Sequence, residues 1–150
     1  MSVLSAGAAV PEFELKTSEG EPFTAADLAG KRTVLVFYPF AFSPVCTDQL
    51  QLFERKLDEF AAAGATVYGI SCDAGWSQKA FADQLGVSIA QLSDFEPKGA
   101  TCEAFGVLHE GGFAQRALIV VSADGVIEWS YQAPSPAELP GPGMVLAELH

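Results

Sequence analysis

Hydrophobic residues follow two different periods along this chain, and the change between them separates strands from helices. Residues 33–38 (TVLVFY) and 65–71 (ATVYGIS) are continuous runs rich in β-branched and aromatic side chains, typical of strands buried on both faces of a sheet. Between them, apolar positions recur at steps of three and four, which predicts one helix with a single apolar stripe. The stripe consists of Cys46, Leu50, Phe53, Leu57 and Phe60.

The ends of this predicted helix carry residues that suit them. Ser43 is a good N-cap, and Pro44 fits the first helical position because an N–H there would have no partner inside the helix. Gly64 fits the position just past the end. We therefore expect a βαβ unit over residues 33–71, with a right-handed crossover and with its strands at the centre of the sheet.

The rest of the chain alternates between strand and helix patterns in the same way. The predicted elements are a hairpin over residues 13–16 and 21–23, a helical turn over 25–28, helices over 76–85 and 98–105, a short strand at 91–92, and a second hairpin over 113–122 and 126–132. Residues 134–143 are rich in Pro and Gly and predict a loop before a short tail. This order predicts an α/β fold with a mixed central sheet flanked by helices and an N-terminal β-hairpin.

Length and composition narrow the class of protein. The 150 residues predict a single domain over 1–150, and a hydrophobic content of 49% excludes intrinsic disorder. No apolar run reaches the roughly 18 residues of a membrane span, and the N-terminus lacks the pattern of a signal peptide. Eight Lys and Arg stand against nineteen Asp and Glu, a net charge of −11. Such an acidic chain is not expected to bind nucleic acid or an anionic membrane.

The cysteines point to a reducing compartment, and we expect the cytoplasm. Three cysteines, Cys46, Cys72 and Cys102, are widely spaced, and the two histidines are isolated. There is no C-x-x-C motif and no Cys/His cluster, so we expect no structural zinc, no other metal or cofactor, and no disulfide framework.

Cys46 occupies a position where a thiol can become reactive. In open α/β sheets chemistry tends to lie at the carboxyl ends of strands, and residues 39–46 lie at such an end. Cys46 falls in the first helical turn, where free amide groups and the helix dipole favour the thiolate, which is the nucleophilic form of cysteine. The alternative is a buried, inert thiol on the apolar stripe.

Arg116 favours the reactive interpretation. It lies in the predicted strand 113–122, which should be mostly buried, and a buried guanidinium is costly unless an anion accompanies it. A thiolate on the neighbouring helix would supply that negative charge. The alternative is an arginine at a strand end, with its head group in water or paired to a surface carboxylate.

Three further residues have both a functional and a structural interpretation. Ser43 can cap the helix or donate its hydroxyl to a substrate beside the thiol. Pro39 ends the strand, and its lack of an N–H leaves room beside the thiol. Gln49 projects near the same face as Cys46 or is a solvated helix position.

Together these residues form a known pattern. Residues 39–46, Pro39-Phe-Ala-Phe-Ser43-Pro-Val-Cys46, read as P-x-x-x-S-x-x-C directly after a strand and at the start of a helix. This resembles the active-site signature of the peroxiredoxins, which have a thioredoxin-like fold. The resemblance extends over the whole chain, through the segments GISCD, LSD, EAFGV and RALIVVSADGVIEW. The sequence is most similar to the alkyl-hydroperoxide-reductase-E-like and bacterioferritin-comigratory-protein-like classes.

The resemblance implies a role for each residue. Cys46 would be the peroxidatic cysteine, whose thiolate attacks hydrogen peroxide or an organic hydroperoxide and becomes a sulfenic acid. Ser43 would hydrogen-bond the peroxide, Arg116 would stabilise the thiolate and the leaving oxygen, and Pro39 would shield the thiol. Gln49 matches a polar position of the active-site network. An external thiol or thioredoxin-like protein would be the reductant.

The sequence departs from the family at the resolving cysteine. The position five residues after Cys46 is Gln51, the second common placement falls near Ala82 and Asp83, and the tail 144–150 has no cysteine. Two routes remain: an external thiol reduces Cys46, or Cys72 or Cys102 resolves it after local unfolding. Our hypothesis is the one-cysteine route.

Other functions start from the same residues. A thioredoxin-like disulfide oxidoreductase is weakened by the missing C-x-x-C, since Ser43 stands where its first cysteine would be. A peroxide sensor or holdase-like protein would share the first chemical step. Phe40, Phe42 and Trp76 either pack in the core or form an apolar rim or the interface of a homodimer.

Overall fold

Seven strands form one mixed sheet in the computed structural model, which describes residues 2–149. The strand order is β2-β1-β5-β4-β3-β6-β7. The strands are β1 (Glu14–Lys16), β2 (Pro22–Thr24), β3 (Arg32–Phe37), β4 (Ala65–Ser71), β5 (Ala90–Ser93), β6 (Ala117–Val121) and β7 (Ile127–Gln132). β3 runs parallel to β4 and antiparallel to β6, so the sheet is mixed as predicted.

The apolar runs that predicted buried strands lie at the centre of the sheet. Strands β3 and β4 have neighbours on both sides, and their side chains alternate between two cores. Val34 and Val36 face one core, whereas Leu35 and Phe37 face the other. The predicted N-terminal hairpin is β1 and β2, and it joins the sheet edge where Lys16 pairs with Ser93 of β5.

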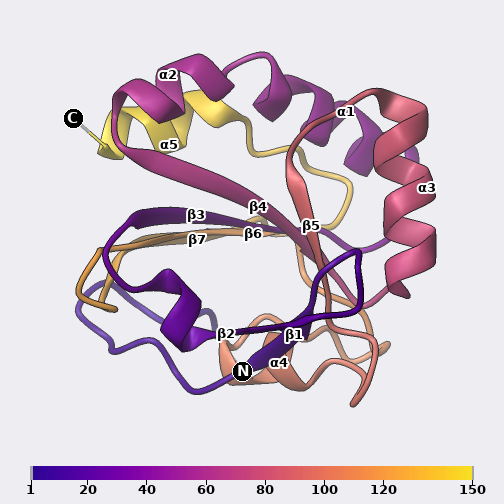
Figure 1. Ribbon diagram of the computed structural model, residues 1–150, viewed down its shortest axis with the longest axis horizontal. Coiled ribbons are helices and arrows are strands. Elements are labelled where there is room, and N and C mark those ends of the chain that lie inside the picture. The colour runs from indigo at the N-terminus through magenta and orange to yellow at the C-terminus, as the bar shows by residue number, and fades with distance from the viewer. Residues whose placement is uncertain (1, 150) are drawn as a thin grey trace.

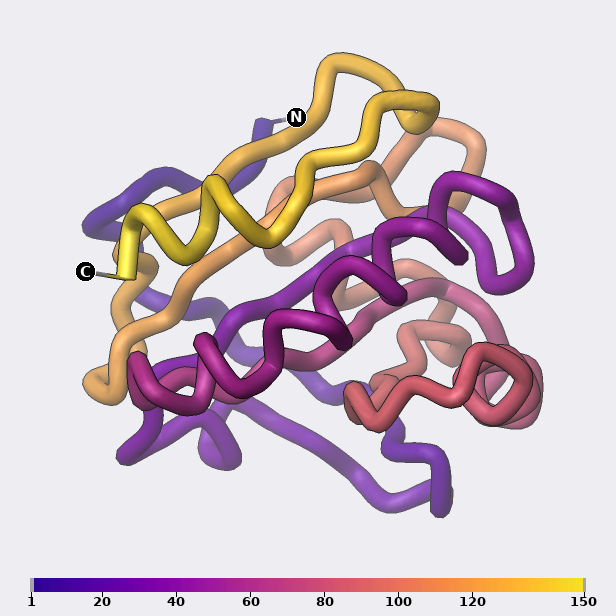
Figure 2. The backbone as a smooth tube through the Cα atoms, turned by 90° about the horizontal axis from the view of Figure 1, so that it is seen from above, coloured from indigo at the N-terminus to yellow at the C-terminus, as the bar shows by residue number. Residues whose placement is uncertain are grey.

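Helices cover the two faces of the sheet unequally. Figure 1 shows α1 (Pro44–Glu54), α2 (Leu57–Ala62) and α5 (Pro142–Glu148) above the sheet, and α3 (Gly75–Leu85) at its side. The N-terminal segment, the 3₁₀ turn η1 (Ala25–Leu28) and the short helix α4 (Ala100–Ala104) lie below it. In Figure 2 the yellow α5 follows the same face as α1 and α2. Within the described residues, no helix is long and apolar enough to cross a membrane.

The predicted single helix after β3 is two helices. α1 ends at Glu54, and α2 begins at Leu57. No Pro or Gly causes the break; the carboxylate of Glu54 accepts hydrogen bonds from the Ser88 N–H and hydroxyl, both at 2.8 Å, and from the Ile89 N–H at 3.2 Å. These tertiary contacts hold the end of α1 against the segment before β5. The apolar stripe nevertheless continues, because Phe53 and Phe60 stack across the break with ring centroids 5.7 Å apart.

Three other boundaries differ from the prediction. The predicted strand 113–122 begins at Ala117, because residues 113–115 turn back to pair with residues 107–109. The predicted helix 98–105 shortens to α4, and α5 begins inside the predicted loop 134–143 and extends through most of the short tail. The tail folds because Val145, Leu146 and Leu149 bury in the core beneath α1 and α2.

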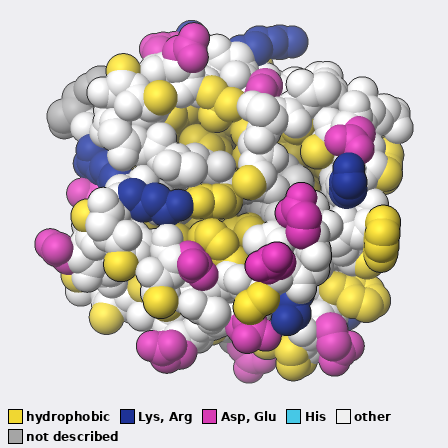
Figure 3. Space-filling model, in the orientation of Figure 1, with side chains coloured by type: hydrophobic (Ala, Val, Ile, Leu, Met, Phe, Trp, Pro, Cys, Tyr) yellow, Lys and Arg dark blue, Asp and Glu magenta, His cyan; other side chains and the backbone are white. Residues whose placement is uncertain are grey.

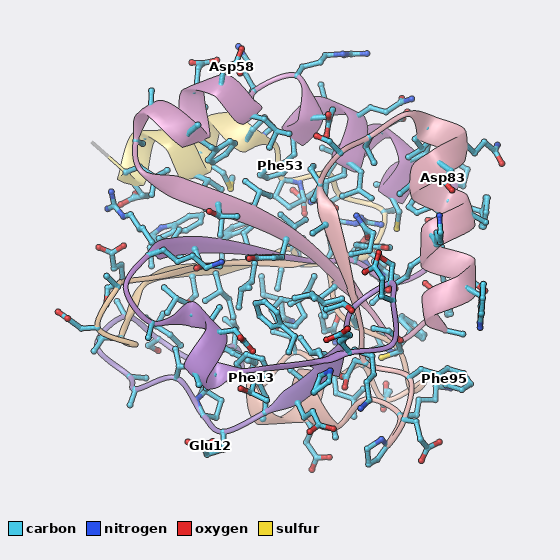
Figure 4. The ribbon with its side chains drawn as sticks, viewed as in Figure 1. Glu12, Phe13, Phe53, Asp58, Asp83 and Phe95 are labelled. Atoms are coloured by element: carbon cyan, nitrogen blue, oxygen red, sulfur yellow. The ribbon has the colours of Figure 1, made fainter. Side chains whose placement is uncertain are left out.

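Side-chain orientation follows the layers. In Figure 4, Phe53 points from α1 toward the sheet, whereas Asp58 on α2 points away from the molecule. Figure 3 shows Asp and Glu side chains spread across the same view of the surface. The acidity of the chain is therefore carried by the solvated exterior, as a net charge of −11 requires if the two cores are to remain apolar.

Candidate active site

The predicted site lies where β3 ends and α1 begins. Tyr38 and Pro39 are buried after the strand, and the loop reaches α1 through Phe42. Phe42 has a φ of 72°, in the left-handed region. Among residues 2–149 it is the only non-glycine residue with a positive φ. A bulky residue in that region costs on the order of 1–3 kcal/mol and persists only where its surroundings impose it.

Asp73, which follows β4, is one group that imposes this loop conformation. Its Oδ2 accepts hydrogen bonds from the Ala41 N–H and from the Ser71 hydroxyl, both at 2.8 Å. The Ser71 hydroxyl in turn accepts a 2.9 Å bond from Gln78 of α3. Sequence reasoning missed Asp73, although its place at the carboxyl end of a central strand is a signal that could have identified it.

Cys46 and Arg116 meet in the core although they are far apart in the sequence. Arg116 Nη2 donates to Cys46 Sγ at 3.2 Å. Cys46 is fully buried, and Arg116 is 2% exposed. Arg116 directly precedes β6 rather than lying inside it, and its backbone carbonyl still accepts a bond from the Ala133 N–H.

The other partners of Arg116 are neutral. Nε donates to the Pro136 carbonyl at 2.8 Å, and Nη1 donates to Gln49 Oε1 at 2.7 Å. Among residues 2–149 no Asp or Glu forms an ion pair with Arg116. A buried guanidinium needs an anion, and Cys46 is the ionisable group that it contacts. The guanidinium therefore lies against a sulfur and two neutral oxygens.

Gln49 is a buried member of this network. It is fully buried, its Oε1 accepts from Arg116, and its Nε2 donates to the Pro140 carbonyl at 3.1 Å. The structure thus excludes the solvated position that the sequence left open. Gln49 orients Arg116 and joins α1 to the loop 134–141. Sequence analysis did not identify the Pro136 and Pro140 carbonyls, because backbone acceptors leave no side-chain pattern.

Ser43 is the N-cap residue of α1, but its hydroxyl makes no cap hydrogen bond. The intrahelical bond at this end runs from the Thr47 N–H to the Ser43 carbonyl at 2.9 Å. The Ser43 hydroxyl, which is partly exposed, and the amide of Cys46 within the first turn are therefore not used by capping. Such groups can serve as donors to a small polar ligand.

Tyr38 is a neutral neighbour of the site. Burial raises its pKa far above the ordinary value, so the phenol remains protonated and donates to Gln91 Oε1 at 2.6 Å. This bond satisfies a hydroxyl that would otherwise be unpaired inside the core that contains Cys46. Its role is structural.

Cys72 and Cys102 lie away from Cys46. Both belong to the core below the sheet, which contains Leu35 and Phe37. Cys46 belongs to the core above the sheet, which contains Val34 and Val36. Cys72 and Cys102 are close to each other, with their Sγ atoms 3.8 Å apart. The structure therefore brings together the two candidate resolving cysteines and separates both from the candidate nucleophile.

A family model described as the AhpC/TSA family matches residues 6–130. The chain belongs to the AhpC/TSA family. The protein named alkyl hydroperoxide reductase E of Mycobacterium tuberculosis is 34% identical over 145 residues, covering 95% of this chain and 90% of the relative. Peroxiredoxin Bcp of Escherichia coli is 35% identical over 135 residues, covering 85% of both. The crystal structure of Peroxidoxin BcpB from M. tuberculosis aligns with a TM-score of 0.85 at 29% identity, over 97% of this chain and 96% of that one.

These relatives confirm the fold and the class of reaction predicted from the sequence. The chain is a peroxiredoxin with a thioredoxin-like fold, and peroxiredoxins are thiol-dependent peroxidases.

Proposed function

We propose that Cys46 is the peroxidatic cysteine and that it reduces hydrogen peroxide and small organic hydroperoxides. The observation that carries this proposal is the 3.2 Å contact between Arg116 Nη2 and Cys46 Sγ, in a core where no carboxylate of residues 2–149 pairs with the guanidinium. A thiolate is the form of cysteine that attacks peroxide, and this position stabilises it twice, through the guanidinium and through the first turn of α1.

The oxidative step moves one oxygen atom. The Cys46 thiolate attacks one peroxide oxygen, the S–O bond forms, and the O–O bond breaks. The departing oxygen takes up a proton and leaves as water or an alcohol, and Cys46 becomes a sulfenic acid. Negative charge grows on the departing oxygen, and Arg116, the Ser43 hydroxyl and the Cys46 amide are donors available near it. Pro39 is buried just before this loop and has no backbone N–H, so it shields the thiol without offering it a hydrogen bond.

Gln49 acts as a positioning residue. It fixes the guanidinium by accepting from Nη1, while the Pro136 carbonyl fixes Nε. The remaining guanidinium nitrogen, Nη2, therefore points at the sulfur of Cys46. A donor held in place in this way can stabilise the transition state without first being reoriented.

We infer a one-cysteine route for the reductive step. An external thiol attacks the sulfenic sulfur and releases water, which leaves a mixed disulfide, and a second thiol then releases Cys46 as a thiol. The position of Cys72 and Cys102 in the opposite core supports this route, because neither sulfur shares a core with Cys46. The reductant is a small thiol or a thioredoxin-like protein. Three free cysteines fit a reducing compartment such as the cytoplasm.

A homodimer would place its contact beside this site. Phe40, Phe42 and Trp76 are 47%, 48% and 85% exposed, so each offers apolar surface that a second copy of the chain can cover. Phe40 packs on Phe113 and Phe42 packs on Phe81, with ring centroids 4.9 Å and 5.2 Å apart.

Replacing the nucleophile tests the proposal. Cys46→Ser should lose the fast hydroperoxide turnover measured with excess reducing thiol, because a serine hydroxyl is not ionised at neutral pH. The matched variant Cys72→Ser changes the same atom on the other face of the sheet and should retain fast turnover. Turnover of Cys46→Ser at the wild-type rate would refute the assignment. Oxidation of the wild type that stops after one equivalent, despite excess thiol, would favour a sensor.

A further inference from the structure

The core below the sheet contains a second pair of thiols. Cys72 follows the last residue of β4, and Cys102 lies in α4, thirty positions further along the chain. Their Sγ atoms are 3.8 Å apart and share a hydrogen bond. Two sulfurs in a disulfide are about 2.05 Å apart, so bond formation requires an approach of less than about 2 Å.

The carboxylate of Asp94, which lies beside this pair, already accepts hydrogen bonds from the backbone. Asp94 lies with both sulfurs within a group whose ligand atoms are all within 4.8 Å of one another. Its Oδ1 accepts from the Thr101 N–H at 3.0 Å, and its Oδ2 accepts from the Cys102 N–H at 2.8 Å. Both carboxylate oxygens therefore serve the first turn of α4. The arrangement favours chemistry between the two sulfurs over coordination of an ion by all three residues.

The two thiols are not equivalent. Cys72 is 6% exposed, whereas Cys102 is fully buried. The hydrogen bond from Cys102 lowers the pKa of Cys72, and the same bond, together with burial, raises the pKa of Cys102. The sulfur nearer the surface is thus the one that ionises first.

A cavity lies close to Cys72 along the chain. Its volume is about 520 Å³, and its lining includes Ala74, Trp76, Ser93, Phe95 and the turn between β1 and β2. In Figure 4, Phe95 projects outward at this corner of the molecule. Ala74 in this lining is two residues after Cys72, which is itself 6% exposed, so an oxidant needs only a local opening to reach the sulfur.

We propose that Cys72 and Cys102 form a second redox centre, a dithiol that hydroperoxide converts to an intramolecular disulfide. The Cys72 thiolate attacks a peroxide oxygen, so that Cys72 becomes a sulfenic acid while water or an alcohol leaves. The Cys102 sulfur then attacks the sulfenic sulfur, the S–S bond forms, and water leaves with the proton of Cys102. Two thiols are oxidised and one peroxide is reduced.

This disulfide would join the end of β4 to α4 on the face opposite Cys46. No arginine contacts Cys72 as Arg116 contacts Cys46 among the described residues. Oxidation of the pair should therefore be slower than oxidation of Cys46 and should require more peroxide. The oxidised protein should melt at a higher temperature, because the cross-link constrains the unfolded chain.

The experiment uses Cys46→Ser, so the outcome does not depend on the role proposed for Cys46. The variant is treated with excess hydrogen peroxide, the remaining thiols are alkylated, and the protein is digested without reduction for mass spectrometry. We expect the intact variant to lose two hydrogen atoms, to yield a cross-linked peptide pair containing Cys72 and Cys102, and to regain its original mass with a reducing agent.

A matched double variant separates the two steps. Cys46→Ser with Cys102→Ser should gain oxygen at Cys72 instead of losing hydrogen, because the partner sulfur is absent. The proposal is overturned if both thiols of Cys46→Ser remain alkylatable after peroxide, or if Cys72 gains oxygen there without a cross-link. Stoichiometric zinc in the purified protein, released when Cys72 and Cys102 are alkylated, would overturn it as well.

Discussion

The burial of Arg116 is hard to explain by packing alone, because its side chain carries a positive charge. A guanidinium that is 2% exposed gives up most of its hydration, and here it receives two neutral oxygens and one sulfur in return. Neutral acceptors satisfy its hydrogen bonds but not its charge. The proposed function accounts for this burial, because a thiolate is the anion that the proposed reaction uses.

Removing this guanidinium should slow the attack on peroxide. Arg116→Ala takes away a donor aimed at the reacting atoms, and the loss of such a donor typically costs roughly 100- to 1,000-fold in rate. The measurement is the rate of the first turnover with hydrogen peroxide, together with the ultraviolet absorbance of the thiolate, which should fall. Arg55→Ala is the control, because Arg55 is an exposed residue at the end of α1 and carries the same charge. Equal rates in the two variants would contradict the assigned role.

Asp94 gives a prediction for the dependence of stability on pH. Burial raises the pKa of this carboxyl, so the folded protein retains the proton to higher pH than the unfolded chain. Between the two pKa values the unfolded state binds fewer protons, and stability therefore falls as pH rises. The contribution is complete below the unfolded-state pKa and is lost as pH rises through the folded-state pKa.

Asp94→Asn isolates this effect, because an amide resembles the protonated carboxyl and does not titrate. The free energy of unfolding of the wild type, minus that of Asp94→Asn, should decrease as pH rises through the acidic range. Denaturant unfolding at a series of pH values measures it. A difference that instead increases with pH would show that the two backbone N–H bonds outweigh burial.

At this scale the sequence singled out Cys46 and Arg116, which the structure brings into contact, but not how they are held. Cys46 and Ser43 were found because capping and helix periodicity are local, and Arg116 because an arginine amid apolar residues is conspicuous. The burial of Gln49 was missed because it depends on the loop 134–141, which is distant in sequence. Asp73 and the backbone of Phe42 depend in the same way on where separate strands end.

Among the elements, α5 illustrates a helix that tertiary packing decides. It spans Pro142–Glu148, is too short to be stable alone, and follows a segment rich in Pro and Gly. Its side chains Val145 and Leu146, together with the following Leu149, pack into the core that contains Cys46. The carbonyl of Leu149 also accepts a 2.9 Å bond from Arg32 Nη1, which fastens the end of the chain to β3.

The packing of α5 can be measured with two neighbouring residues. Val145 is fully buried, so Val145→Ala should reduce the free energy of unfolding by about 1–3 kcal/mol. Met144, the preceding residue on the same helix, is 38% exposed, and Met144→Ala should change stability by no more than about 0.5 kcal/mol. Equal losses from both variants, measured by denaturant unfolding, would mean that α5 does not pack as described.

Element types followed from the sequence more reliably than element ends. The buried runs became β3 and β4, and Gly86 ends α3 with φ 69° in the left-handed conformation that glycine adopts at such ends. The break between α1 and α2 could not be predicted, because the apolar stripe passes through it and the contacts of Glu54 at that point are with residues more than thirty positions away.

In the molecule as a whole, the sheet separates Cys46 from the pair Cys72 and Cys102. Cys46 lies above it with Arg116, and Cys72 and Cys102 lie below it with Asp94. Alternation along β3 and β4 creates the two cores, so the separation follows from the same pattern that predicted buried strands. The strand order, however, depends on contacts between distant segments, which the pattern of one segment does not specify.

The most direct test of the account is the fate of Cys46 after one equivalent of hydroperoxide. The intact wild-type protein is oxidised without added thiol, alkylated, digested without reduction and mapped by mass spectrometry. We predict that the peptide containing Cys46 gains oxygen and is joined to no other cysteine of the chain. A stoichiometric disulfide between Cys46 and Cys72 or Cys102, or oxidation elsewhere while Cys46 stays reduced, would contradict the account.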